Sequence, residues 1–97
     1  MKNDSMNTMG DVKKKNQEWK IEISAGNGTI TLVLIDKNNN RVSRKISSSE
    51  FIIENVHEIG RNLEFEYNKA NNTILEPYNI SRIIGLVNDQ IIAESDK

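Results

Sequence analysis

A row of glutamates and the single histidine are the residues of this chain that could do metal or acid–base chemistry. Glu50, Glu54 and Glu58 are spaced four residues apart, which would align their carboxylates on one face of a helix. A metal needs further converging ligands, and an acid–base pair needs environments that separate two pKa values. No cysteine is present to assist His57. We therefore interpret these residues as a helix surface, and predict no catalytic residue, metal site or cofactor.

The only run of basic residues is Lys13, Lys14 and Lys15, with Trp19 shortly after it. A flexible lysine arm can bind phosphates without base specificity, and a nearby aromatic ring can stack on a base. The cluster supports an alternative hypothesis, a nucleic-acid-binding accessory protein. The chain as a whole has a net charge of −1, which does not favour that class. Trp19 also alternates with isoleucines, as a core residue does.

Two arginines and two apolar residues make the best candidate surface for a partner. Arg41 and Arg44 belong to one predicted strand, and arginine is a favoured contact residue at protein interfaces. Val33 and Ile35 give the preceding strand a second, semi-apolar face. That face would be covered by a C-terminal helix or would serve as a docking surface.

Composition places these residues in one small domain. The chain has 97 residues, of which 36% are hydrophobic and 28% are charged. Residues 1–17 hold almost nothing apolar, so we expect a disordered polar tail followed by a single α+β domain over residues 18–97. No signal peptide is visible and the longest apolar run is Leu32 to Ile35, so we expect a cytoplasmic protein. Frequent Asn, Ile and Lys indicate a low-GC bacterium, or a phage or mobile element of one.

Alternation of apolar and polar residues predicts a β-hairpin at the start of the domain. One strand runs from Trp19 to Ser24 and the next from Thr29 to Ile35, joined by the turn residues Ala25 to Gly28. A loop of two residues and a loop of four residues place each side chain on the same face of the sheet, because they differ by one full period of a strand. Either loop places a common set of apolar side chains on one side of the sheet: Ile21, Ile23, Ile30, Leu32 and Leu34.

A third strand follows the turn from Asp36 to Arg41. A three-residue loop over Asn38, Asn39 and Asn40 would pair Leu34 with Arg44 and Leu32 with Ile46. A four-residue loop would instead move Val42 and Ile46 to the opposite face. We favour the three-residue loop because it joins Ile46 to the apolar face. The strand is polar, so we expect it at an edge of the sheet.

The segment Ser47 to Glu50 predicts a helix start. It has the pattern of a capping box, and Ile46 and Phe51 have the spacing of a hydrophobic staple. We expect a helix from Ser48 to Ile59, ended by Gly60 as a C-terminal cap, with Ile52, Val56 and Ile59 on its apolar stripe. A strand would follow from Leu63 to Tyr67. The alternative is one helix that continues through Gly60 to Tyr67.

The remainder of the chain predicts a short strand and a second helix. The strand would run from Thr73 to Glu76 and end at Pro77. Asn79 would cap a helix, for which a hairpin turn at Val87 to Ile91 is the alternative. The apolar residues of that helix share one face: Ile80, Ile83, Ile84, Val87 and Ile91.

These observations predict an α+β fold in the order β-β-β-α-β-β-α, with a small antiparallel sheet packed against one or two helices. By elimination, the function we expect is that of a non-enzymatic interaction protein, an adaptor or inhibitor, without membrane attachment. Its expected partner is a protein, and an edge strand would also permit a homodimer. Its predicted partner-binding residues are Val33, Ile35, Arg41 and Arg44.

Overall fold

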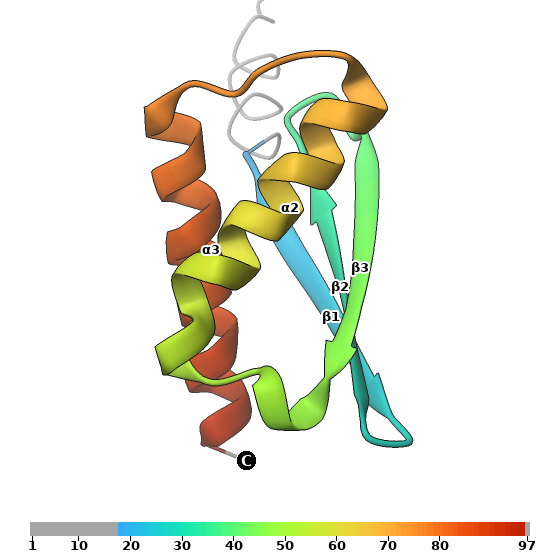
Figure 1. Cartoon of the computed structure of the whole chain (residues 1–97), viewed down its shortest axis with the longest axis vertical. Helices are drawn as coiled ribbons and strands as arrows, with labels where there is room; N and C mark the ends of the chain where they lie inside the picture. The colour runs from blue at the N-terminus through green and yellow to red at the C-terminus, as the bar shows by residue number, and fades with distance from the viewer. Residues whose placement is uncertain (1–17, 97) are drawn as a thin grey trace, which may run out of the picture.

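The computed structural model describes residues 18–96, and within them the fold is α+β (Figure 1). Strands β1 (Lys20–Gly26), β2 (Thr29–Ile35) and β3 (Arg41–Ser47) precede helices α2 (Val56–Asn71) and α3 (Pro77–Ser95). Two short 3-10 turns, η1 (Ser48–Glu50) and η2 (Ile53–Asn55), lie between β3 and α2. The predicted α+β class is confirmed. The predicted tail, residues 1–17 with Lys13 to Lys15, lies outside the described residues.

The first hairpin has the predicted faces. Asn27 and Gly28 form a two-residue loop, with φ of 58° and 77°, and positive φ at both positions is what a type I′ turn requires. The register pairs Ile21 with Leu34 and Ile23 with Leu32. The apolar residues of β1 and β2 therefore meet on one face, as the alternation predicts.

The second hairpin has the predicted faces but a different register. Leu34 pairs with Val42 and Leu32 with Arg44, so the loop holds five residues rather than three. The loop is longer because the Asp36 side chain organises it, as described below. A shift of two residues keeps every side chain on its face, since the period of a strand is two. The strand order β1-β2-β3 makes β3 an edge strand, as predicted.

The capping box at Ser47 does not start a long helix. The Ser47 side chain makes no capping bond, and its Oγ lies 3.1 Å from Ser49 Oγ instead. The chain makes one 3-10 turn and then becomes extended at Ile52, with φ of −134° and ψ of 160°. This break lets Phe51 enter the core at 7% exposure, whereas Ile52 and Ile53 are 42% and 47% exposed. Ile52 therefore does not belong to the apolar stripe.

Helix α2 runs through Gly60, so the predicted glycine stop and the strand from Leu63 to Tyr67 are wrong. A Cβ on Gly60 would lie 2.5 Å from Ile84 Cγ1 and 3.2 Å from Ile84 Cα. Glycine is present because α2 and α3 approach closely there, not because the backbone needs a left-handed cap. The alternative of a continuous helix is the observed one, with Leu63 and Tyr67 on its buried face.

The connection between the helices contains no strand. Helix α2 ends at Asn71, and its C-cap residue Asn72 has the left-handed φ of 51°. Residues 73–76 are irregular, so the predicted strand from Thr73 to Glu76 is wrong. Pro77 opens α3 at its first turn, where a missing N–H costs nothing. Glu76, not Asn79, occupies the N-cap position, and the helix continues where the hairpin alternative was considered.

Both helices pack on one face of the sheet and against each other (Figure 1). Helix α2 contacts β3 and helix α3 contacts β1. The order is therefore β-β-β-α-α over the described residues. The buried core comes from β1, β2, α2, α3 and the segments beside them: Trp19, Ile21, Ile30, Leu32, Leu34, Phe51, Ile59, Leu63, Tyr67, Ile83, Val87 and Ile91. Strand β3 contributes the partly buried Val42 and Ile46, which pack against this core.

Candidate functional site

A buried carboxylate holds the loop between β2 and β3. Asp36 is 5% exposed, and its Oδ2 accepts a hydrogen bond of 2.6 Å from the Tyr67 hydroxyl on α2. Asn40 Nδ2 donates to the same oxygen at 2.9 Å. Oδ1 accepts from the backbone N–H groups of Asn38 and Asn40, each at 2.8 Å. The carboxylate therefore fixes the loop and ties it to α2.

These bonds shift the pKa of both partners in opposite directions. Burial raises the pKa of Asp36, but the bonds from Tyr67, Asn40 and Asn38 outweigh it and hold the pKa below its usual value of 3.8. Burial and the adjacent carboxylate raise the pKa of Tyr67 to about 12. Asp36 is thus ionised and Tyr67 protonated at neutral pH. Four donors occupy the carboxylate, so it acts as an anchor rather than as a proton acceptor for a substrate.

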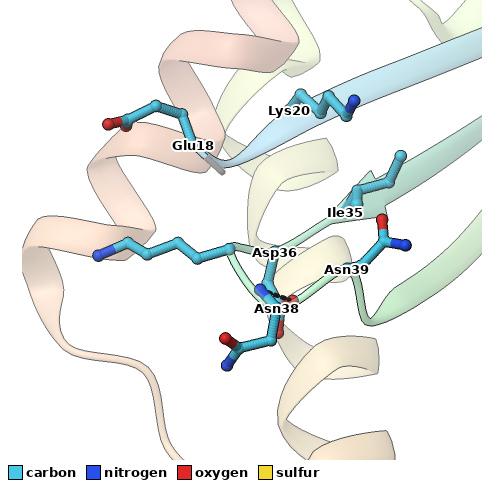
Figure 2. Close-up of a pocket in the computed structure, with 7 residues that line it drawn as sticks. Glu18, Lys20, Ile35, Asp36, Asn38 and Asn39 are labelled. Atoms are coloured by element: carbon cyan, nitrogen blue, oxygen red, sulfur yellow. Dashed lines mark hydrogen bonds between the residues drawn. The ribbon is translucent and has the colours of Figure 1, made fainter. Parts of the chain in front are cut away.

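A polar hollow of about 450 Å³ opens beside this loop (Figure 2). Figure 2 shows Lys20 and Ile35 on neighbouring strands, with Asp36 and Asn38 in the turn beside them. Its lining comes from the start of β1 and from the loop: Glu18, Lys20, Ile35, Asp36, Lys37, Asn38 and Asn39. The Asp36 carboxylate is already hydrogen-bonded within the loop and to Tyr67, so it is not available to a ligand. The hollow therefore offers surface charge rather than a preorganised reactive group.

A smaller hollow of about 200 Å³ borders the same loop near Trp19 and Tyr67. The two rings are tilted by 55° with centroids 5.1 Å apart, a favourable geometry for an aromatic pair. Trp19 is 7% exposed, and its Nε1 has no hydrogen-bond partner within the described part of the chain. Trp19 is therefore a core residue here, as its alternation with Ile21 predicts.

The face of the sheet opposite the helices carries a mixed set of side chains. Across the strands, Lys20 pairs with Ile35 and Ile35 with Arg41, while Glu22, Val33 and Ser43 form the next row. Ser24, Thr31 and Lys45 form the third row, and Gly26, Thr29 and Ser47 the fourth. We call these four rows the outer face. No helix of residues 18–96 covers it, because α2 and α3 both lie on the other side (Figure 1).

An ion pair crosses the outer face above its apolar residues. Arg41 Nη1 of β3 lies 3.5 Å from Glu22 Oε1 of β1, so the two side chains meet over β2 between the rows of Ile35 and Val33. Both side chains remain about half exposed, at 53% and 55%. Ile35 is 1% exposed and Val33 is half-buried. The predicted residues Val33, Ile35 and Arg41 therefore share one face of the sheet, but Ile35 is buried and only Val33 and Arg41 are accessible on it.

Arg44 lies on the opposite face of β3. It pairs with Leu32 of the apolar face, and its Nη1 lies 3.4 Å from Glu66 Oε2 on α2. Its Nε is buried and has no partner within residues 18–96. The structure thus separates Arg44 from Arg41. Arg44 joins the sheet to α2, while Lys45, which the sequence prediction did not include, lies on the outer face.

The residues considered for acid–base chemistry do not converge. Glu50, Glu54 and Glu58 belong to η1, η2 and α2 respectively, so they do not share one helix face. All three are exposed, as is His57. Among the described residues, no group of three Asp, Glu or His side chains is arranged to hold a metal ion. The carboxylate with an unusual environment is that of Asp36. In the sequence it belongs to an asparagine-rich segment typical of an ordinary turn, so no sequence signal singled it out.

Neither the lengths and apolarity of the helices nor comparison with known proteins assigns this chain to a class. None of the helices in residues 18–96 combines the length and apolarity that a membrane span needs. No protein-family model, curated protein or solved structure matches the chain.

Proposed function

We propose that this protein is a small non-enzymatic interaction protein, an adaptor or inhibitor, that docks the outer face of its sheet onto a protein partner. The observation that carries the proposal is the arrangement of that face. It sets the half-buried Val33 and the threonines of β2 between charged residues on both flanking strands, and neither α2 nor α3 covers it. Such an arrangement of charges can steer and select a partner.

The charges of the outer face suggest the chemistry of the partner. Lys20, Arg41 and Lys45 carry positive charge on this face, against the single negative charge of Glu22. A partner segment with exposed carboxylates would complement it, and arginine can bind a carboxylate through two parallel hydrogen bonds. β3 pairs only with β2 among the described strands. Its other edge offers N–H and C=O groups that an extended segment could use for register.

Binding would proceed by exchange of the ion pair above β2. The Arg41–Glu22 contact is half exposed, and such pairs contribute only about 0–1 kcal/mol to stability. Opening it costs the fold little. An acidic partner would take over Arg41 and gain access to Val33. This makes Arg41 the residue whose charge should decide binding.

The test uses two charge reversals on the outer face and a matched one elsewhere. Arg41→Glu and Lys45→Glu should each abolish capture of the partner from the native host, because both place negative charge against an acidic surface. Lys69→Glu is the control, since Lys69 is an exposed lysine on α2 without an ion-pair partner among residues 18–96. Arg44→Glu is unsuitable, because it would set a second carboxylate against Glu66. Equal binding by Arg41→Glu and Lys69→Glu would refute the proposal.

The nucleic-acid alternative makes a different prediction in the same assay. Replacing Lys13, Lys14 and Lys15 with alanine should leave binding intact if the outer face carries it. If those lysines hold phosphates, their loss should weaken binding and flatten its salt dependence. Binding that depends on the lysines and not on Arg41 would assign the protein to the nucleic-acid-binding class.

A further inference from the structure

The side of α3 that faces away from the sheet is hollowed at its centre. A pocket of about 470 Å³ lies over Gly85, lined by Tyr78, Ser81, Arg82, Gly85, Leu86 and Asp89. Tyr78 at its rim is 69% exposed, and Ile92 farther along is 47% exposed. In Figure 1, α3 forms one side of the molecule, with α2 and the sheet on its other side. No other helix or strand of residues 18–96 covers this outward surface.

No contact within residues 18–96 explains the glycine at position 85. A Cβ at this position would meet nothing within 4 Å, and Gly85 lies in the middle of a 19-residue helix. Glycine weakens a helix relative to alanine, so its presence here calls for a physical reason. Gly60 shows what such a reason can be, because its missing Cβ lets α2 approach Ile84 of α3 closely. Gly85 would allow the same close approach on the opposite side of α3.

The residues around Gly85 complement a second copy of themselves. If two α3 helices cross antiparallel about a two-fold axis between Gly85 and Leu86, residues whose numbers are equally far from that axis face each other. Arg82 then faces Asp89 of the second copy, and Asp89 faces Arg82 in return. Gly85 faces Leu86, and Tyr78 faces Ala93. Every pair matches opposite charges or a large side chain with a small one.

The spacing of these residues also fits a seam between helices. Positions 78, 82, 85 or 86, 89 and 93 recur in steps of three and four, which keeps them on one stripe of an α-helix. Asp89 is exposed and has no ion-pair partner among residues 18–96. Arg82 contacts Glu18 at 3.0 Å through one Nη2 and is 38% exposed. A guanidinium has five N–H donors, so it can bind a second carboxylate as well.

We propose that the protein forms a homodimer through antiparallel contact of α3 with α3 of a second copy, centred on Gly85 and Leu86 and held by two reciprocal Arg82–Asp89 ion pairs. This surface is separate from the outer face of the sheet. A dimer would present two outer faces to a partner. The occupant is a second copy because the charge pattern is self-complementary about the two-fold axis.

The test is the mass of the full chain in solution, by analytical ultracentrifugation from low micromolar concentration upward. The wild type should be a dimer. Arg82→Asp should leave two acidic residues facing each other and Asp89→Arg two arginines, so each should weaken dimerisation roughly tenfold or more. Lys69→Asp, at an exposed lysine of α2, is the matched control and should dimerise like the wild type.

A charge exchange tests the register directly. Mixing the Arg82→Asp chain with the Asp89→Arg chain should restore a dimer, because each residue then faces its opposite charge in the partner. The double variant R82D/D89R should dimerise by itself for the same reason. Gly85→Leu should fold, since open space surrounds Gly85, but should not dimerise.

Circular dichroism should confirm that each variant is folded, so that a loss of dimer can be assigned to the contact itself. A wild type that stays monomeric at hundreds of micromolar would overturn the proposal. So would single variants that dimerise as well as the wild type, which would assign the contact to another surface such as the edge of β3. Folded single variants that fail to pair when mixed would also overturn it.

Discussion

Replacing Gly60 with alanine tests the closest contact between the two helices. The new Cβ would lie 2.5 Å from Ile84 Cγ1 and 3.2 Å from Ile84 Cα. Rotation of the Ile84 side chain can relieve the first contact. It cannot relieve the second, because the Cα belongs to the backbone of α3. Carbon atoms pack best at about 3.5–4.0 Å, so the helices must separate by several tenths of an ångström.

Two effects of opposite sign set the magnitude. Alanine is the better helix former by about 1 kcal/mol. Overpacking a well-packed contact costs about 1–3 kcal/mol, and the severity of the Ile84 contact places Gly60→Ala in the upper half of that range. The net result is a loss of about 1–2 kcal/mol in the free energy of unfolding. For a domain of this size each kcal/mol lowers the melting temperature by roughly 4–8 °C.

Urea denaturation of matched variants is the assay. Gly85→Ala is the control, because a Cβ there meets nothing within 4 Å and should stabilise the helix by about 1 kcal/mol. Measured at concentrations where the protein is monomeric, the two alanine substitutions should therefore shift the midpoint in opposite directions. In an Ile84→Ala background, the cost of Gly60→Ala should shrink, since Cγ1 is gone. If Gly60→Ala stabilises the protein as much as Gly85→Ala does, the helix contact described here is wrong.

Four further predictions concern the loop anchor and the cap. Tyr67→Phe removes a 2.6 Å hydrogen bond to a buried carboxylate and should cost about 1.5–3 kcal/mol in thermal or urea unfolding. Because the folded-state pKa of Asp36 is lowered, its stabilisation is present above the unfolded pKa and is lost as the pH falls through the folded one. Stability should thus drop below about pH 4, more steeply in the wild type than in Asp36→Asn, and parallel acid profiles would contradict this. The pKa of about 12 for Tyr67 predicts a second loss as the pH rises between about 10 and about 12, which Tyr67→Phe should lack. Ser47→Ala should change the free energy of unfolding measured in urea by less than about 0.5 kcal/mol, because Ser47 makes no capping bond. A loss near ~1 kcal/mol would instead support the capping box.

The elements that sequence predicted well are those set by local rules. Asn27 and Gly28 accept positive φ, and period-two alternation on either side of them defines the faces of the first hairpin. The faces of β3 followed from the same period, even though the loop is two residues longer than expected. The apolar stripe of α3 was also visible, with Ile83, Val87 and Ile91 fully buried as predicted.

The failures involve residues whose partners are far away in the chain. Gly60 looks like a helix stop until Ile84 is placed against it, 24 positions later. The alternation of Leu63, Phe65 and Tyr67 suggested a strand, but Phe65 is 62% exposed and only the other two face the core. Asp36 looks like an ordinary turn residue because its partner Tyr67 is 31 positions away. No local pattern contains these contacts.

The placement of the candidate partner-binding residues followed from local rules for three of the four residues and failed for the fourth. Val33, Ile35 and Arg41 share the outer face, and strand alternation alone is enough to place them there. Arg44 was grouped with Arg41 because they belong to one strand, yet an odd separation of three places them on opposite faces. The contact of Arg44 with Glu66 depends on α2 continuing past Gly60, which the strand prediction for that segment excluded.

The most direct test of the proposed function is site-specific photocrosslinking in the native host. A photoreactive amino acid at Thr31, which lies on the outer face between Ser24 and Lys45, should crosslink a defined protein partner. The same group at Phe65, exposed on the far side of α2, should not. Adding Arg41→Glu should abolish the Thr31 crosslink while the domain remains folded. A partner captured equally from both positions, or a Thr31 crosslink that persists with Arg41→Glu, would contradict docking through the outer face.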